Sequence, residues 1–334
     1  MKAVKISSPV VVAGPDRAET VGEYLEEWLW GKQSLRPSTH AAYETHIRRY
    51  LAPRLGGLPL EQLRPVHIER MYRDLASDEH GRALSVSTLH RVHATLMSAL
   101  NTAVKRGLID RNPAATVELP RRTRTQQQVW SPEEVREFLK VSSEHRLHLL
   151  YLLLALAGLR RGEVLALRWE DVDLNAGTIR IERAAVRVGK DTVIGPPKSA
   201  SGVRTLAVDD ETTRKLSWHA ARQRLEVLQE TGVKFQPDLV FTNPDGSILS
   251  PIWVSREFDR LVTRAGLRRI RLHDLRHTSA SLGLQAGETL VEVSRRLGHS
   301  SITITADTYS HISPLVARES AERLAASVYG GGER

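Results

Sequence analysis

The short run from Leu119 to Thr125 constrains the fold of this chain most, because it divides the sequence in two. It reads Leu-Pro-Arg-Arg-Thr-Arg-Thr, so it is polar and basic, and its proline disfavours helix at the residue before it. The chain has 334 residues, which is enough for two domains with a core each. We therefore predict a flexible segment over 1–18, a first domain over 19–119, a linker over 120–130 and a second domain over 131–334.

Apolar residues in the first part recur at three- and four-residue spacing, which predicts an all-α domain. Val21, Tyr24, Leu25 and Trp28 make one such stripe. Further helices are predicted from the capping residues Ser38 or Thr39 to about Leu51, from about Pro65 to Leu75, and from about Ser85 to Arg106, with Gly107 past the last helical residue.

The second part changes its hydrophobic period. Ser131-Pro132-Glu133-Glu134 is a capping box, and helices are predicted at about 132–142 and 146–157. Residues 178–181 and 203–208 then alternate and are rich in β-branched side chains, which predicts strands, with turns near Gly189 and Gly195. Helices return from Asp210. The predicted fold is mainly α with a small antiparallel β-sheet: an all-α N-terminal domain followed by an α+β domain.

Composition narrows the classes of function. The chain has no cysteine, which excludes disulfides and thiolate zinc sites, and no apolar run near the roughly 20 residues of a membrane span. We expect a cytoplasmic protein without a membrane partner. The formal net charge is +9, and residues 1–124 hold 19 basic against 13 acidic residues. A basic excess of this kind favours a polyanionic partner such as nucleic acid.

Four short motifs in the second part carry residues suited to phosphodiester chemistry. A nucleophile that attacks a phosphodiester approaches negative charge, so Arg and His donors must stabilise the transition state, and the leaving oxygen needs a proton. A tyrosine with a pKa of about 10 also needs cations and a base to act as the nucleophile at neutral pH. The motifs are Gly158-Leu159-Arg160-Arg161-Gly162-Glu163, His273-Asp274-Leu275-Arg276-His277, Leu297-Gly298-His299-Ser300-Ser301 and Asp307-Thr308-Tyr309-Ser310-His311.

In this order the motifs resemble the tyrosine recombinase, or phage integrase, family. The resemblance covers the C-terminal two hundred residues, and the N-terminal helices are similar to the family's SAM-like core-binding domain. It implies a metal- and ATP-independent recombinase without a cofactor, which cuts DNA through a 3′-phosphotyrosine on Tyr309. The implied catalytic residues are Arg160 and Arg276 on the phosphate, His273 as proton acceptor, His299 on the phosphate, Lys198 as proton donor to the leaving oxygen, and Tyr309, with Glu163, His277 and His311 in support.

The resemblance also implies partners. These are double-stranded attachment or recombination sites, held in a clamp of the two domains, and a homotetramer on DNA to which a C-terminal helix over about 314–328 contributes. It leaves open whether a recombination directionality factor or a DNA-bending host protein takes part. The implied reaction is integration or excision of a mobile element. Expected DNA contacts are Arg36, Arg48, Arg49, Arg91, Arg121, Arg122, Arg124 and Arg161.

Other interpretations of the same residues stay open. The chain could be a catalytically silent, sequence-specific DNA-binding regulator of the same fold, or an enzyme of the same chemistry that resolves, inverts or only nicks and reseals DNA. Lys190 competes with Lys198 for the role of proton donor. Metal binding at His90 and His93 is not favoured, because no third ligand lies at suitable spacing. Magnesium at Asp171 and Asp173 is not favoured either, because aspartates at this position are typical of a turn before a strand.

Overall fold

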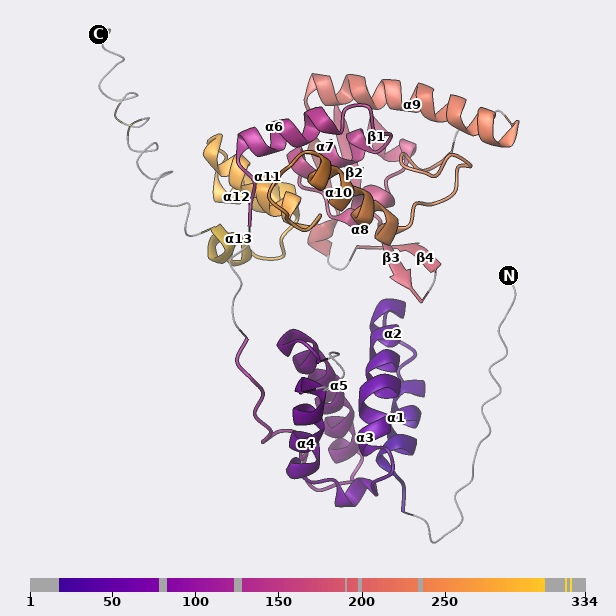
Figure 1. Cartoon of the computed structure of the whole chain (residues 1–334), viewed down its shortest axis with the longest axis vertical. Coiled ribbons are helices and arrows are strands. Elements are labelled where there is room, and N and C mark those ends of the chain that lie inside the picture. The colour runs from indigo at the N-terminus through magenta and orange to yellow at the C-terminus, as the bar shows by residue number, and fades with distance from the viewer. Residues whose placement is uncertain are drawn as a thin grey trace. The chain divides into compact units, whose positions relative to one another are not determined.

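The computed structural model describes residues 18–77, 83–122, 128–189, 191–197, 200–233 and 237–309, together with Glu322 and Ala325. It divides into two compact units, Met1–Thr125 and Gln126–Arg334, each of which is described by itself (Figure 1). The predicted flexible segment, apart from Ala18, lies outside the described residues. So does the predicted C-terminal helix, apart from Glu322 and Ala325.

The first unit is built of helices over its described residues, and the predicted helices are all present. Thr20 caps the first in a reciprocal capping box with Glu23. The predicted cap of the second helix was wrong, because the helix begins at Pro37 and its N-cap is Arg36 rather than Ser38 or Thr39. This helix runs on through a π-helical segment and ends four residues beyond the predicted position. The elements are α1 (Val21–Trp30), α2 (Pro37–His46), the π-helical segment η1 (Ile47–Leu51), α3 (Ala52–Leu55), the short 3-10 helix η2 (Leu60–Gln62), α4 (Pro65–Ala76) and α5 (Val86–Lys105).

Aromatic residues hold α1 against its neighbours. Trp28 is buried and stacks on Tyr43 with ring centroids 5.3 Å apart. Its indole nitrogen donates a hydrogen bond to Thr102 Oγ1 at 3.1 Å. The buried hydroxyl of Tyr24 donates to the carbonyl of Ala99 at 2.6 Å. The polar atoms of both rings are therefore satisfied inside an apolar core, as buried aromatic side chains require.

The second unit combines helices with two small antiparallel sheets. In the first sheet the order is β1-β2-β5, with Ile179 paired to Leu206, and β3 and β4 form a separate hairpin. The helices are α6 (Pro132–Val141), α7 (His148–Leu156), α8 (Arg161–Leu165), α9 (Asp210–Thr231), α10 (Pro251–Arg264), α11 (Asp274–Gln285), α12 (Leu290–Leu297) and α13 (Ile302–Tyr309), with short 3-10 helices η3 (Trp169–Asp171) and η4 (Ala200–Gly202). The strands are β1 (Val172–Asp173), β2 (Thr178–Ile181), β3 (Ala184–Val188), β4 (Asp191–Gly195) and β5 (Arg204–Ala207).

The predicted fold class is confirmed, with one addition. The strand predicted at 178–181 is β2, and the one predicted at 203–208 is the shorter β5. The sequence pattern marked Gly189 as a turn but did not identify β3 and β4 on either side of it. Their burial explains the omission, because β4 alternates only between exposed and half-buried residues and so lacks a clear inward apolar face.

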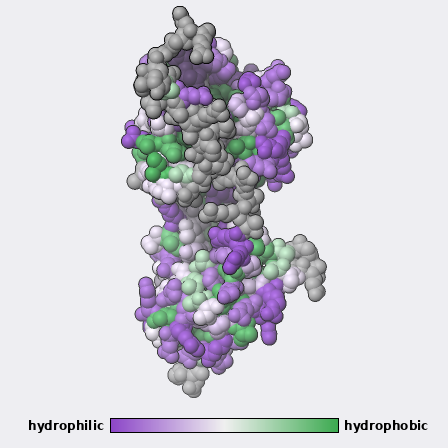
Figure 2. All heavy atoms as spheres, turned by 90° about the vertical axis from the view of Figure 1, so that its left-hand side faces the viewer, coloured by the Kyte–Doolittle hydropathy of each residue, from purple (hydrophilic) through white to green (hydrophobic). Residues whose placement is uncertain are grey.

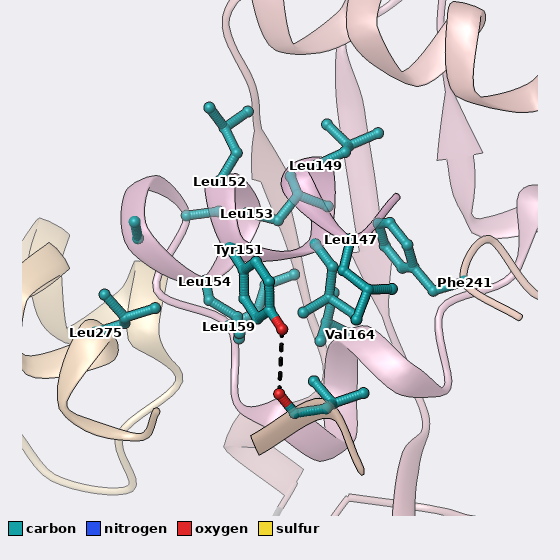
Figure 3. Close-up of a cluster of buried hydrophobic side chains, with 14 of the residues drawn as sticks. Leu147, Leu149, Tyr151, Leu152, Leu153, Leu154, Leu159, Val164, Phe241 and Leu275 are labelled. Carbon is teal, nitrogen blue, oxygen red and sulfur yellow. Dashed lines mark hydrogen bonds between the residues drawn. The ribbon is translucent and has the colours of Figure 1, made fainter. Parts of the chain in front are cut away.

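Helix α7 lies at the centre of the second unit. Nearly all of its residues are apolar and buried, as expected for a helix surrounded by other elements. Figure 3 shows Tyr151 within this cluster, where its hydroxyl donates a hydrogen bond to the carbonyl of Val254 at 3.1 Å. The C-terminal end of α7 leads directly into Gly158 and α8. A rigid apolar core therefore supports the segment that carries the first of the four motifs.

The surface of the described residues is mostly polar. On the face drawn in Figure 2, hydrophilic residues predominate and hydrophobic ones form small separate patches. Among the helices that the structure describes, none combines the length and the apolar character needed to span a bilayer.

Candidate functional site

The site is built where three turns of the second unit meet. Arg160 is the residue before α8, and its backbone N–H donates to the Glu163 carboxylate at 2.9 Å. His273 and Arg276 lie at the start of α11. His299 follows α12, which ends at Gly298 in a left-handed conformation. These elements are far apart in the sequence, and their hydrogen bonds to one another bring the motifs together.

Glu163 is the acidic centre of the cluster. Its side chain is 1% exposed and accepts from Arg160 Nη1 at 2.6 Å and from Arg204 Nη2 at 2.9 Å. Burial by itself would raise the pKa of this carboxyl, but the hydrogen bonds and charge of Arg204, assisted by Arg160, hold the pKa below its ordinary value. Glu163 is therefore ionised at neutral pH and fixes both guanidinium groups.

Three consecutive carbonyl groups at the end of α12 receive arginine side chains. The carbonyl of Arg296 accepts from Arg204 Nε at 2.6 Å, that of Leu297 from Arg276 Nη2 at 2.5 Å, and that of Gly298 from Arg160 Nη2 at 3.0 Å. The last carbonyls of a helix lack partners within the helix, and cations are favoured there. The end of α12 thus sets the positions of three guanidinium groups.

Two glycines give these groups room. Gly298 has φ +66°, and a Cβ atom there would lie 2.7 Å from the carbonyl oxygen of Ser201 and 3.1 Å from Arg204 Cδ. Gly158 has φ +65°, and its Cβ would lie 2.5 Å from Leu297 Cδ2. The carbonyl of Gly158 also accepts from Arg276 Nη1 at 2.7 Å. The glycines of the first and third motifs are needed for left-handed backbone and close packing.

The histidines of the site are neutral at pH 7. Burial, followed by the charges of Arg276 and Arg160, lowers the pKa of His299 to about 4. Burial and the neighbouring His273 lower the pKa of His277 to about 4, and the two rings meet edge to face at 5.4 Å. Burial, then Arg276, also lowers the pKa of His273. Neutral imidazoles can accept protons, so the positive charge of the cluster belongs to its arginines.

The cluster is suited to binding an oxyanion. Arg160 and Arg204 pair with the Glu163 carboxylate, whereas Arg276 is held by the carbonyls of Gly158 and Leu297. The Arg160 side chain is 37% exposed, so part of its guanidinium group faces solvent, whereas the Arg204 side chain is only 7% exposed. Guanidinium groups held by hydrogen bonds to protein match phosphate geometry and need little reorganisation when an anion binds.

Three of the predicted site residues lie partly or wholly outside the described part of the chain. Tyr309 is the last residue of α13, and its side chain lies outside what the structure describes; Lys198 and His311 lie wholly outside it. Helix α13 packs against α12, and its buried Thr305 hydrogen-bonds to His299 Nδ1 at 2.8 Å. This contact ties α13 to the residue after α12.

The arginines predicted to contact DNA are exposed where the structure describes them. They are Arg36, Arg48, Arg49, Arg91, Arg121 and Arg122, while Arg124 lies outside the described residues. Arg48 pairs with Glu44 at 3.0 Å. Arg161 is exposed too, but it donates to Ser255 Oγ at 2.8 Å and to the carbonyl of Pro251, so it also fastens α8 to α10.

The disfavoured metal sites have other partners. His90 contacts the carbonyl of Pro120 at 2.9 Å, and His93 contacts the Tyr72 hydroxyl at 3.1 Å. Asp171 is buried and pairs with Arg183 at 2.8 Å. Within the described part of the chain, no group of three or more potential ligands could hold a metal ion.

The sequence pattern missed Arg204 as a member of this cluster. Its signal is present, because in β5 Arg204 alternates with Thr205 and so shares a face with the buried Leu206. A basic residue at an inward strand position indicates a buried acidic partner. The alternation and β-branched residues of 203–208 predict the strand, but they do not by themselves predict a role for Arg204 in the site.

Comparisons with known proteins agree with this architecture. The model of the "Phage integrase family" matches residues 128–315, more than half of the chain, and that of the "Phage integrase, N-terminal SAM-like domain" matches residues 20–76. A tyrosine recombinase XerC-like protein of Caldanaerobacter subterraneus subsp. tengcongensis is 28% identical over 326 residues, covering 91% of this chain and 82% of that protein. The integrase of Mycobacterium phage D29 is 28% identical over 287 residues, covering 85% of this chain and 72% of its own.

Solved structures share the fold. The Tn1549 transposon integrase in complex with transposon right end DNA has a TM-score of 0.75 at 23% identity, over 92% of this chain and 99% of that chain. A lambda integrase dimer bound to a COC′ core site has a TM-score of 0.65 at 18% identity, over 85% of this chain and 97% of that chain. Because both family models match, the chain belongs to the phage integrase family of tyrosine recombinases.

Proposed function

We propose that this chain is a site-specific DNA recombinase that cleaves and rejoins strands through Tyr309, for integration or excision of a mobile element. The observation that carries the proposal is the convergence of Arg160, Arg276 and His299 on the end of α12. Arg160 and its acceptor, the carbonyl of Gly298, are 138 residues apart in the sequence. Part of the Arg160 guanidinium group faces solvent at this point, which an anion-binding site requires.

Each residue has a proposed role in the reaction. Arg160 and Arg276 hold the non-bridging oxygens of the scissile phosphate, and His299 donates a further hydrogen bond to it. His273, neutral because its pKa is lowered, accepts the proton of the attacking Tyr309 hydroxyl. Lys198 gives a proton to the leaving 5′ oxygen. The 3′-phosphotyrosine conserves the energy of the phosphodiester, so religation needs no ATP.

The placement of α13 supports the role of Tyr309. Residue 309 follows Thr305 by four positions in a helix, so the two positions share one face of α13. Thr305 is fully buried and bonded to His299. Position 309 thus lies one helical turn beyond a residue that contacts His299, and this supports Tyr309 as the nucleophile.

The proposed partner is duplex DNA. The integrase structures similar to this chain include a transposon integrase in complex with transposon right end DNA and a lambda integrase tetramer bound to a Holliday junction. The exposed arginines of the first unit, among them Arg49 and Arg91, supply contacts for the phosphate backbone. We propose that the chain assembles as a tetramer on paired recombination sites.

The test is a covalent trap. Purified full-length protein is incubated with a library of nicked genomic duplexes, in which loss of a short fragment after cleavage prevents religation, and protein–DNA adducts are collected under denaturing conditions. The proposal expects a set of related sequences in the adducts and no adduct from Tyr309→Phe. Phenylalanine keeps the ring and removes only the hydroxyl, so DNA binding is retained.

A matched control separates the enzyme from the regulator. Tyr50→Phe removes a tyrosine hydroxyl from the first unit, whereas the four motifs belong to the second, and it is expected to leave adduct formation unchanged. Specific binding by the wild-type chain with no adduct would contradict the proposal and favour a catalytically silent DNA-binding regulator. Relaxation of plasmids that lack a paired site would favour a nicking and resealing enzyme instead.

A further inference from the structure

Arg204 joins three parts of the second unit that are separate in the sequence. It lies at the start of β5, and its side chain is only 7% exposed. Its Nη2 pairs with Glu163 Oε2 in α8 at 2.9 Å, its Nε donates to the carbonyl of Arg296 at the end of α12 at 2.6 Å, and its Nη1 donates to the carbonyl of Gly202 at 3.0 Å. One guanidinium group thus links β5, α8 and α12.

We infer that Arg204 is a positioning residue for strand cleavage, which sets the places of Arg160 and of the His299 segment without touching the DNA itself. The inference rests on the proposed recombinase function. All three guanidinium nitrogens of Arg204 already donate to protein acceptors, namely both oxygens of Glu163 and the carbonyls of Arg296 and Gly202, which engages four of its five N–H groups. The Arg160 side chain, in contrast, is open to solvent over a third of its surface. The effect of Arg204 must therefore pass through the groups that it holds.

The first route runs through the shared carboxylate. Arg204 meets both oxygens of Glu163, Oε2 at 2.9 Å and Oε1 at 3.3 Å, while Arg160 meets Oε1 at 2.6 Å and donates its backbone N–H to Oε2. Four donors thus fix the carboxylate in one orientation. Without Arg204, Glu163 would be free to turn and would take the guanidinium group of Arg160 with it.

The second route runs through the end of α12. The carbonyl that Arg204 holds is followed directly by the carbonyls that hold Arg276 and Arg160, and then by His299. A shift of this short segment moves the partners of two phosphate-binding arginines at once. Reacting groups held within about 0.5 Å of their productive positions are needed for catalysis, so a small shift has a large effect on rate.

Stability alone is a weak explanation for this arrangement. A buried ion pair recovers little net free energy after its desolvation, and apolar replacements of similar volume are often as stable. What the pair provides is geometry, because a planar guanidinium fork reaches a carboxylate and a carbonyl in different directions at the same time. A lysine at position 204 carries the same charge but only one nitrogen, and it cannot hold both.

The experiment compares single-turnover cleavage, at saturating protein, on a nicked site recovered by the covalent trap. The variants are Arg204→Met, Arg204→Lys and the control Arg183→Met. Arg183 is a matched control because it pairs with the buried Asp171 at 2.8 Å and with Glu170 at 2.9 Å. Both ion pairs belong to the same unit as the site but include no residue of the site. Thermal unfolding and DNA affinity are measured for each variant.

Arg204→Met is expected to lower the cleavage rate on the order of 100-fold, the scale of a small misplacement of reacting groups, with DNA affinity retained. Arg204→Lys is also expected to lower the cleavage rate, but by a smaller factor, because lysine keeps the positive charge without linking Glu163 to the carbonyl of Arg296. Arg183→Met is expected to cleave at the wild-type rate, although it loses thermal stability. If Arg204→Met does not fold, the comparison of Arg204→Lys with Arg183→Met carries the test.

Two further readouts separate positioning from a structural role. Because Arg204 is the main group that lowers the pKa of Glu163, its removal should raise that pKa and move the acid limb of the rate–pH profile to higher pH. Because one of the two routes runs through the Glu163 carboxylate, the loss of rate in Arg204→Met combined with Glu163→Gln should be smaller than the product of the two single losses.

The outcomes that overturn the inference are distinct from those that overturn the function. If the wild-type protein cleaves DNA and both Arg204 variants cleave equally fast, the inference is wrong while the proposed function stands. The same holds for a loss of rate in Arg183→Met equal to that in the Arg204 variants, or for an unchanged pH profile in Arg204→Met. A wild-type chain that forms no adduct on any DNA overturns the proposed function and this inference with it.

Discussion

Replacing Gly298 with alanine should damage both the stability and the activity of the second unit. Gly298 ends α12 in the left-handed conformation, with φ +66°. Its carbonyl accepts from Arg160, and the next residue is His299. A methyl group at this position therefore acts at the point where the turn, the arginine cluster and the third motif meet.

The magnitude has two parts. A residue other than glycine in the left-handed region costs roughly 1–2 kcal/mol. The added Cβ would also lie 2.7 Å from the backbone oxygen of Ser201 and 3.1 Å from both Cδ and Nη1 of Arg204. Overpacking of this kind costs typically about 1–3 kcal/mol. The two parts together span about 2–5 kcal/mol of destabilisation. The nearest atom is backbone and Arg204 is itself held by Glu163 and Arg296, so neither can easily move away from the added methyl group. We therefore expect Gly298→Ala to lower the free energy of unfolding by about 3–4 kcal/mol.

Gly266→Ala is the matched control. Gly266 also has positive φ, +62°, but a Cβ there would meet no atom within 4 Å. This variant should lower the free energy of unfolding only by the cost of left-handed backbone in alanine, about 1–2 kcal/mol. The free energy of unfolding is measured by chemical denaturation, and cleavage by the covalent trap. Equal destabilisation by the two variants would refute the argument from close packing, and full cleavage by Gly298→Ala would refute the role of this turn in holding Arg160.

Three other predictions follow from the structure. The pKa values of His277 and His299 are both about 4, below the ordinary value of about 6.5, so between these pH values the unfolded chain binds more protons than the folded chain. The free energy of unfolding should therefore fall as the pH is lowered from about 6.5 to about 4. Glutamine at both positions should flatten this dependence, and an unchanged slope would contradict the presence of buried neutral imidazoles. Tyr151→Phe removes the bond to Val254 drawn in Figure 3 and should cost about 1 kcal/mol in a urea titration; wild-type stability would show that the bond contributes nothing. DNA affinity should drop steeply between low and physiological salt as counterions are released, and a flat dependence would count against phosphate contacts.

Much of the fold could be predicted because local signals were strong. The capping box predicted at Ser131 and Glu134 is present at the start of α6, and the helix predicted from about Ser85 begins at Val86. Residues 178–181 form a strand because they alternate in burial. The β3–β4 hairpin was not predicted, since neither strand has a fully buried face, and only the φ-positive Gly189 between them gave a signal.

The site could be located in the sequence but not assembled from it. The motifs identify Arg160, Arg276 and His299 as candidates, yet their meeting depends on contacts across long stretches of chain, such as the 118 residues between Arg276 and its acceptor Gly158. No local pattern encodes such contacts. For Arg204 the local pattern places the residue on the inward face of its strand, but it does not identify the partner, Glu163, which precedes it by 41 residues.

The most direct test of the central claim is to find the amino acid to which DNA becomes attached. Adducts recovered from the covalent trap are digested with trypsin and nuclease and analysed by mass spectrometry. Cleavage after Arg296 and Arg318 releases residues 297–318, a peptide with Tyr309 as its one tyrosine. We expect this peptide to carry a 3′-linked nucleotide on Tyr309; attachment at any other residue, or sequence-specific binding that never yields an attached nucleotide, would contradict the account.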